Sequence, residues 1–190
     1  MKLIKTKKIK SLIKLLLIAI ISFSVLLGVG IFLLGTFLVP VWEYKVRDFD
    51  TYKSDFQTIA NLAYREYSKG QMKDSYIIVN SYIIVNENPD ETVNLRYENV
   101  NTEKFVEVTM SQKEQESLLK IVEKAFRHGD MAYLSLIRVR KNEVAFEIEN
   151  GRYSLVYTTD GKKPKFANSP HTFKLKTISY HWYHAWPVED

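Results

Sequence analysis

Residues 15–42 read LLLIAIISFSVLLGVGIFLLGTFLVPVW, and no side chain in this stretch is charged. A helix of this length rises about 42 Å, whereas the hydrocarbon core of a bilayer is roughly 30 Å thick. A tilted transmembrane helix is therefore predicted. A cleaved signal peptide would have a shorter apolar region, of about 7 to 15 residues, and a small-residue cleavage site. The long run and its bulky end at Val39, Pro40 and Trp42 favour an uncleaved anchor.

The charges on either side of this stretch predict its orientation. Six lysines precede it, whereas the segment after it carries both signs of charge. The positive-inside rule then keeps the amino terminus in the cytoplasm and exports the carboxy-terminal part. The six lysines and Glu43 account for the whole formal net charge of +5, so residues 44–190 carry no net charge. This balance argues against nucleic acid as a partner. The six lysines are Lys2, Lys5, Lys7, Lys8, Lys10 and Lys14.

Three segments follow from this pattern. Residues 1–14 are predicted to be a basic cytoplasmic tail, residues 15–42 a single-pass anchor in the cell membrane, and residues 43–190 an extracytoplasmic domain. The chain has no cysteine, so disulfides and cysteine-based metal sites are excluded, which suits a bacterial surface protein. Ser24 and Gly28 are spaced as in helix-dimer motifs, which would allow homo-oligomers. Glycine is common in transmembrane helices, however, so the spacing alone does not support one.

Two amphipathic helices are predicted in the exported domain. The first covers residues 48–70, with Asp48 or Asp50 as its cap and Gly70 ending it in a left-handed conformation. The second begins at the capping box formed by Ser111 and Glu114. Its predicted apolar stripe, closed by Gly129, consists of Leu118, Leu119, Val122, Ala125 and Phe126.

A repeated hexapeptide lies between these helices. Residues 75–80 and 81–86 both read SYIIVN. Because six is an even number, one long strand would keep every side chain of the repeat on its own face. A hairpin turning at Asn80 and Ser81 is the alternative, although serine disfavours the positive φ that such a turn needs. We therefore favour one long or bulged strand.

The remaining strands are predicted at residues 93–97, 105–110, 133–140, 144–149, 153–158 and 172–183. Hairpin turns are expected at residues 141–142 and 150–151. Val144, Phe146 and Ile148 alternate with more polar residues, which predicts a half-buried sheet. The predicted fold is therefore α+β, an N-terminal transmembrane helix followed by a small domain of two helices packed on a mainly antiparallel sheet.

The segment YHWYHAWP at residues 180–187 is the richest local group of functional side chains. Strand alternation places its Tyr180, Trp182, His184 and Trp186 on one face, and a bulge or twist is expected near Thr177. Lys174, Lys176 and Ile178 precede them on the same face. These aromatic rings either close the core or form an exposed platform for sugars or an extended peptide. Tyr180, Trp182 and Trp186 are the candidate ligand contacts.

The histidines of this segment do not predict a metal site. His181 and His184 are three residues apart, so on a strand they point to opposite faces and chelate poorly. Neither a nucleophile motif nor a phosphate-binding loop is present in the sequence. We expect no catalytic residue and no cofactor. The predicted function is a binding or accessory module that contacts an envelope protein, a peptide or a wall polymer. The alternative is an extracytoplasmic hydrolase that uses one of these histidines.

Overall fold

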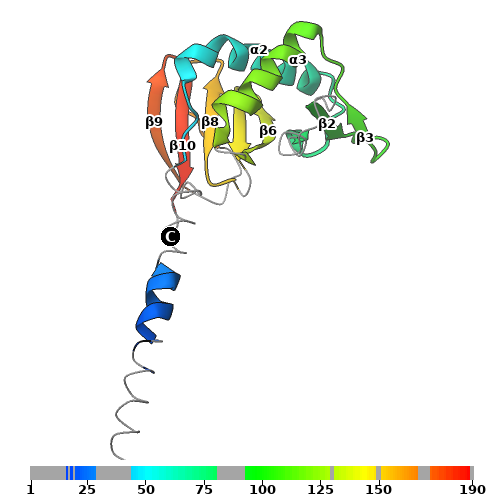
Figure 1. Cartoon of the computed structure of the whole chain (residues 1–190). Coiled ribbons are helices and arrows are strands. Elements are labelled where there is room, and N and C mark those ends of the chain that lie inside the picture. The colour runs from blue at the N-terminus through cyan, green and yellow to red at the C-terminus, as the bar shows by residue number, and fades with distance from the viewer. Residues whose placement is uncertain are drawn as a thin grey trace, which may run out of the picture. The chain divides into compact units, whose positions relative to one another are not determined.

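The computed structural model describes residues 16, 18, 20–28, 44–80, 93–128, 131–148, 151–166 and 172–188 (Figure 1). The chain divides into two compact units, Met1–Pro40 and Val41–Asp190. The second copy of the hexapeptide lies outside the described residues, as does most of the predicted anchor.

In the first unit, residues 20–28 are helical. The Ser24 hydroxyl donates to the Ile20 carbonyl at 2.9 Å, so it is bonded within its own helix. A Cβ added to Gly28 would meet no atom within 4 Å. Searched over the described residues alone, the chain contains no helix that is both long and apolar enough to cross a membrane.

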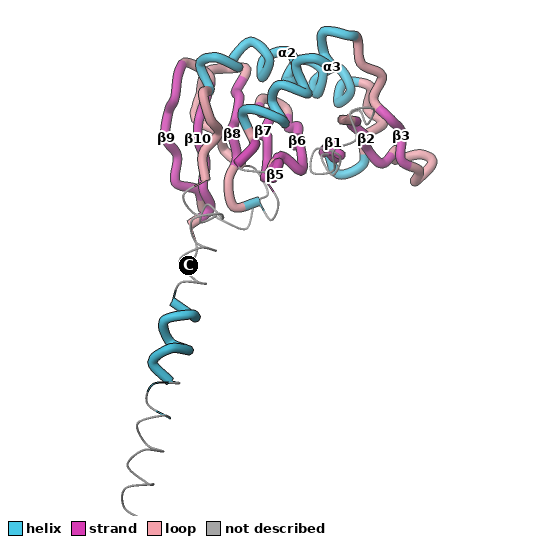
Figure 2. Tube along the Cα trace, in the orientation of Figure 1, coloured by secondary structure: helices cyan, strands magenta, loops and turns pink. Residues whose placement is uncertain are grey.

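The second unit is an antiparallel sheet with helices on one face, which confirms the predicted α+β class. Within the described residues the main sheet has eight strands in the order β3-β2-β1-β6-β7-β8-β10-β9, and β4 and β5 form a separate pair. The helices α2, Phe49–Ser68, and α3, Gln112–Lys120, lie across one face (Figure 2). The strands are β1 Tyr76–Asn80, β2 Asn94–Glu98, β3 Phe105–Glu107, β4 Arg127–His128, β5 Met131–Ala132, β6 Leu134–Arg140, β7 Glu143–Ile148, β8 Ser154–Thr158, β9 Phe173–Ser179 and β10 Trp182–Pro187.

Helix α2 confirms the prediction from periodicity. Phe56, Ile59, Ala60 and Ala63 follow the i, i+3, i+4, i+7 spacing and are fully buried against the sheet. Gly70 has φ 66, as expected for the residue that ends the helix. The predicted cap is wrong for Asp48, because this residue has φ 44 and its side chain makes no capping hydrogen bond.

Helix α3 begins at the predicted capping box. The Glu114 backbone N–H donates to the Ser111 hydroxyl at 3.4 Å, and the Ser111 N–H donates to the Glu114 carboxylate at 2.7 Å. The predicted stripe is wrong at Leu119, which is 38% exposed, whereas Ile121 is buried. Leu118 and Ile121 are three residues apart and share the inner face, and Leu119 falls outside it. The helix continues into a π-helical turn, η3, Ile121–Ala125.

The first copy of the hexapeptide supplies β1. Ile77 pairs with Ile137 of β6, and Val79 pairs with Leu95 of β2. A short 3₁₀ segment, η2, Lys73–Ser75, precedes the strand, and Asp74 and Ser75 have positive φ there. Since residues 81–86 are not described, both the single-strand and the hairpin interpretation of the repeat stay predictions.

Strand β7 is buried on both faces, so the prediction of a half-buried sheet is wrong at this strand. Its face toward the helices carries Val144, Phe146 and Ile148, as expected. On the other face, the Arg138 guanidinium donates to the Glu147 carboxylate at 3.0 Å. Phe166, from the loop after β8, covers a second apolar cluster that includes Ala145. An ion pair and a loop thus cover the face that alternation had assigned to solvent.

The predicted single strand at residues 172–183 is wrong. Strand β9 ends at Ser179, the chain turns at Tyr180 and His181, and β10 returns between β9 and β8. His181 takes φ 71, and its carbonyl accepts the Thr158 N–H at 2.9 Å, which ties the turn to β8. The bulge or twist expected near Thr177 appears as a shift in the pairing of this hairpin. Trp182 pairs with Ser179 and Tyr183 pairs with Thr177, so the ladder skips Ile178.

Candidate functional site

The three candidate ligand contacts do not form one surface. Trp182 is 1% exposed and lies in the core, with ring centroids of Phe49 and Tyr157 at 5.2 and 5.0 Å. Tyr180 is 76% exposed in the turn before β10. Trp186 is half-buried toward the other end of β10, where its indole N–H donates to the Tyr44 carbonyl at 3.0 Å. Only Tyr180 and Trp186 are therefore accessible to a ligand, and they lie at opposite ends of the strand.

His184 is a neutral ring bonded to a buried tyrosine. Its Nδ1 lies 2.7 Å from the Tyr153 hydroxyl, which accepts the Val46 N–H at 3.2 Å. A hydroxyl has one proton and two lone pairs, so that of Tyr153 can bond both groups at once. Burial, followed by the charges of Lys45 and Lys176, lowers the pKa of His184 to about 4. At neutral pH the ring thus carries no charge.

The second histidine of the hairpin has a different partner. His181 Nδ1 contacts the Thr158 carbonyl, so this nitrogen carries the proton. In the described parts of the chain, the polar contacts of the two histidines are with a carbonyl and a tyrosine, and neither is paired with a carboxylate. No group of three or more metal-binding side chains occurs there either. The arrangement needed for an acid–histidine pair is thus not found among these residues.

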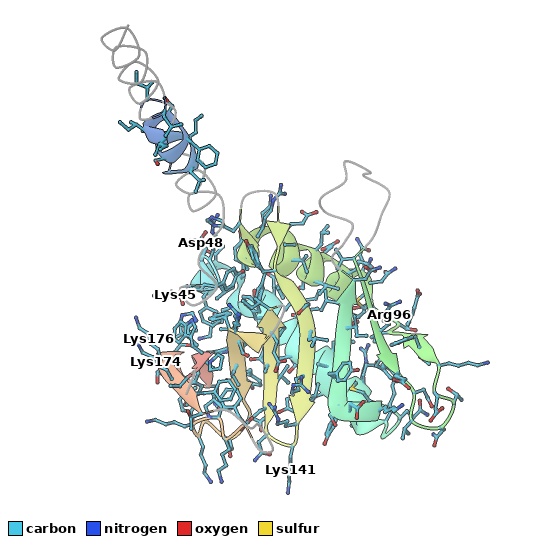
Figure 3. The ribbon with its side chains drawn as sticks, turned by 90° about the horizontal axis from the view of Figure 1, so that it is seen from below. Lys45, Asp48, Arg96, Lys141, Lys174 and Lys176 are labelled. Carbon is cyan, nitrogen blue, oxygen red and sulfur yellow. The ribbon has the colours of Figure 1, made fainter. Side chains whose placement is uncertain are left out.

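Three lysines surround Trp186 and His184. Lys174 lies opposite Trp186 and Lys176 opposite His184 in the β9–β10 ladder. The Lys45 ammonium lies 6.0 Å from the centroid of the Trp186 ring. Figure 3 shows the three lysines together at one side of the sheet, and we call them, with Trp186, the basic margin. Among the described residues, no carboxylate forms an ion pair with any of these ammonium groups.

The opposite margin of the sheet is apolar. Strand β3 is the edge strand, and all three of its residues are exposed. Phe105 is 56% exposed and Val106 is 37% exposed. The guanidinium of Arg96, on neighbouring β2, lies 4.9 Å from the centroid of the Phe105 ring. We call β3 with Arg96 the apolar edge. Sequence alternation predicted the strand but not its exposure, because alternation does not reveal which strand is the outermost.

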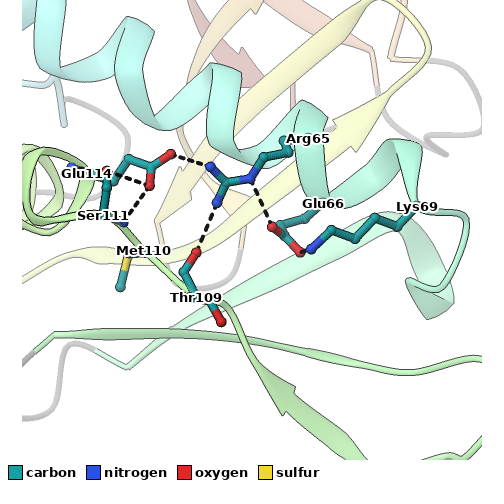
Figure 4. A pocket seen from close by; sticks show the side chains of 7 residues that line it. All are labelled: Arg65, Glu66, Lys69, Thr109, Met110, Ser111 and Glu114. Atoms are coloured by element: carbon teal, nitrogen blue, oxygen red, sulfur yellow. Dashed lines mark hydrogen bonds and ion pairs between the residues drawn. The ribbon is translucent and has the colours of Figure 1, made fainter.

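An open pocket of about 430 Å³ lies between α2 and the start of α3 (Figure 4). Its charged groups bind one another. Arg65 donates to Glu114 at 2.7 Å, to the Thr109 carbonyl at 2.9 Å and to Glu66 at 3.2 Å. Lys69 contacts the other oxygen of Glu66, which is 2% exposed, at 2.5 Å. This network joins the two helices, and its hydrogen-bonding groups are used within the domain.

Comparison with known proteins found no match among family models, curated protein sequences or solved structures. The function is therefore argued from the geometry of the two margins.

Proposed function

We propose that the chain is a membrane-anchored, extracytoplasmic binding module without catalytic activity, and that it holds an extended segment of another envelope protein against β3. The observation that carries this proposal is the exposed, apolar edge strand. An edge strand presents unpaired backbone groups, so an extended peptide can add to it as a further strand.

The directions of the backbone N–H and C=O groups of β3 favour the addition of a further strand. The Val108 N–H donates to the Leu95 carbonyl at 2.8 Å, and the Asn99 N–H donates to the Lys104 carbonyl at 2.9 Å. Because inward and outward groups alternate along an antiparallel strand, the N–H and C=O groups of Phe105 and Glu107 are directed away from β2. Two donor–acceptor pairs are thus available at the outer edge.

The side chains of this edge indicate the kind of segment that would bind. Phe105 offers an apolar ring, and the Arg96 guanidinium beside it offers a cation. On an added strand, alternate residues would face this pair, so a bulky apolar side chain is expected over Phe105. An extended protein segment can pair with the outward N–H and C=O groups of β3 and can also contact the Phe105 ring. A wall polymer would leave those backbone groups unpaired.

The two margins differ in a way that favours β3 over β9 as the protein-binding edge. Lys174 and Lys176 are exposed on β9, and lysines on an edge strand discourage pairing with another chain. Strand β3 instead carries Phe105 and Val106. The domain thus places lysines along one edge, whereas the other edge exposes Phe105 and Val106 beside a single charged residue, Glu107.

The anchor and the export of the domain rest on the amino-terminal sequence. Residues 15–42 carry no charge and six lysines precede them, which favours a single-pass span with the amino terminus inside. The hydrolase alternative takes second place, because among the described residues the hydrogen-bond partner of His184 is the Tyr153 hydroxyl rather than a carboxylate.

Photo-crosslinking in intact membranes tests the binding proposal. A photo-reactive phenylalanine derivative replaces Phe105 in one full-length variant and Tyr180 in a control variant, since both side chains are exposed. We expect a discrete product from position 105 and none from position 180. Glu107→Pro removes one outward N–H and should abolish the product, whereas Glu107→Ala keeps that N–H and should preserve it.

A product at position 105 that survives Glu107→Pro would contradict strand addition. Near-ultraviolet circular dichroism of both Glu107 variants serves as the control for folding. A proline that leaves the spectrum unchanged and the crosslink intact would remove the backbone edge as the binding element.

A further inference from the structure

We propose that the basic margin docks on the anionic phospholipid headgroups of the membrane that holds the anchor. This inference rests on the proposed anchor. In the proposed docking, lysine ammonium groups beside an indole ring recognise the phosphate diesters of the headgroups.

The chain connection brings this margin close to the bilayer. Lys45 follows Trp42, the end of the predicted span, by three residues, and a chain of that length reaches at most about 11 Å. Tyr44 is buried, and its hydroxyl donates to the Phe126 carbonyl at 2.9 Å. Its carbonyl accepts the Trp186 N–H at 3.0 Å. The first described residues after the predicted span are thus tied to β10, beside Lys174.

The charge of the margin complements an anionic surface. The ammonium groups of Lys45, Lys174 and Lys176 are exposed and lie around a ring, His184, that is neutral at pH 7. Residues 44–190 carry no net charge, so attraction to the membrane requires a local cluster of this kind. Each lysine near an anionic surface contributes about 1 kcal/mol, or roughly fivefold in binding.

Trp186 adds an apolar contact to this cluster. Tryptophan is enriched at membrane interfaces because its ring is apolar and its N–H is polar. In this domain the N–H is bonded to Tyr44 and the ring remains half-buried between lysines. The margin therefore combines cations with a ring suited to the headgroup region.

Docking would orient the binding edge. Strands β9 and β3 are the two edges of the eight-stranded order among the described residues (Figure 1), and seven strand spacings amount to roughly 34 Å. With the basic margin at the headgroups, the apolar edge lies at the opposite side of the sheet. It would then be available to a partner rather than pressed against the lipid.

Fluorescence quenching in vesicles tests this proposal. The chain has no cysteine, so Val188→Cys gives one labelling site at the exposed end of β10. The labelled full-length protein is reconstituted in phosphatidylcholine vesicles with or without phosphatidylglycerol, each containing a headgroup-linked quencher. We expect markedly stronger quenching with phosphatidylglycerol than without it. Replacing the three lysines of the margin by glutamine should lower the ratio of docked to undocked protein roughly a hundredfold.

A matched triple variant provides the control. Lys141, Lys162 and Lys163 are exposed in turns and loops away from Trp186, and their replacement by glutamine removes the same charge. This control should quench like the unmodified protein, and an equal loss in both triple variants would overturn the proposal. Soluble glycerol phosphate and sodium chloride of equal ionic strength are then compared as competitors of docking. If only glycerol phosphate releases the domain from the vesicle surface, the ligand is a free phosphate and the lipid assignment is overturned.

If residues 15–42 do not anchor the chain in a membrane, the vesicle experiment gives a different result from that expected when only docking fails. Without an anchor, the full chain would not float with pure phosphatidylcholine vesicles. Flotation with both kinds of vesicle, combined with quenching that does not depend on phosphatidylglycerol, would overturn the docking inference alone.

Discussion

Replacing Trp182 by alanine should destabilise the domain strongly. The side chain is 1% exposed and its ring packs against four aromatic neighbours, with centroids between 5.0 and 6.3 Å away: Phe49, Phe56, Phe146 and Tyr157. Truncating a tryptophan in such a core costs about 3–5 kcal/mol, because both transfer free energy and packing are lost. For a domain of this size, that loss lowers the Tm by about 6–20 °C.

Thermal unfolding of the full-length protein in detergent, followed by near-ultraviolet circular dichroism, measures this change. Tyr180→Ala is the matched control in the same hairpin. Tyr180 is 76% exposed, so its replacement should change the free energy of unfolding by less than about 0.5 kcal/mol. A loss below about 1 kcal/mol for Trp182→Ala would refute the core assignment and return this residue to the candidate ligand contacts.

Two further predictions concern stability. Ile77 is fully buried in β1, so Ile77→Ala should cost about 2–5 kcal/mol, whereas Ile78→Ala, on the half-buried face of the same strand, should cost less; equal losses in chemical denaturation would contradict the assignment of the inner face of β1. The pKa of His184 is lowered to about 4 in the folded protein and is about 6.5 when unfolded, so the unfolded chain binds the extra proton between these values. Stability should therefore fall as the pH drops from 6.5 to 4, and His184→Gln should reduce that fall in a series of Tm measurements against pH; an unchanged slope would exclude His184 as its source.

The helices were predictable because their signals are local. In α2, Phe56, Ile59 and Ala63 are three and four residues apart, so the buried face can be recognised from neighbouring turns. The capping box of α3 needs only Ser111 and Glu114. Such patterns require no knowledge of the rest of the fold. Strands β2, β3, β6, β7 and β8 were predicted to within a few residues for the same reason, whereas β4, β5 and β10 were not predicted.

The C-terminal hairpin was not predictable in this way. Its turn contains neither glycine nor asparagine, and the positive φ of His181 is accompanied by a bond from Thr158 of β8. A long-range contact therefore stabilises a turn that local preference does not favour. Residues 172–183 therefore belong to two strands, β9 and β10, rather than to one bulged strand.

The candidate surfaces depend on contacts between distant parts of the chain. Tyr44 and Trp186 are 142 residues apart in sequence, and their hydrogen bond places Lys45 beside β9 and β10. Alternation grouped Lys174 and Lys176 with Trp186, but no local pattern linked Lys45 to them. The exposure of Phe105 likewise follows from the strand order of the sheet rather than from its own segment.

Cysteine accessibility in intact cells tests the central claim, that an amino-terminal anchor displays this domain outside the membrane. Because the chain contains no cysteine, Tyr180→Cys and Lys10→Cys each provide a single reactive thiol, one in the domain and one in the basic tail. The account predicts that a membrane-impermeant maleimide labels position 180 in intact cells and position 10 only after permeabilisation. Labelling of position 10 in intact cells, together with protection of position 180, would contradict it.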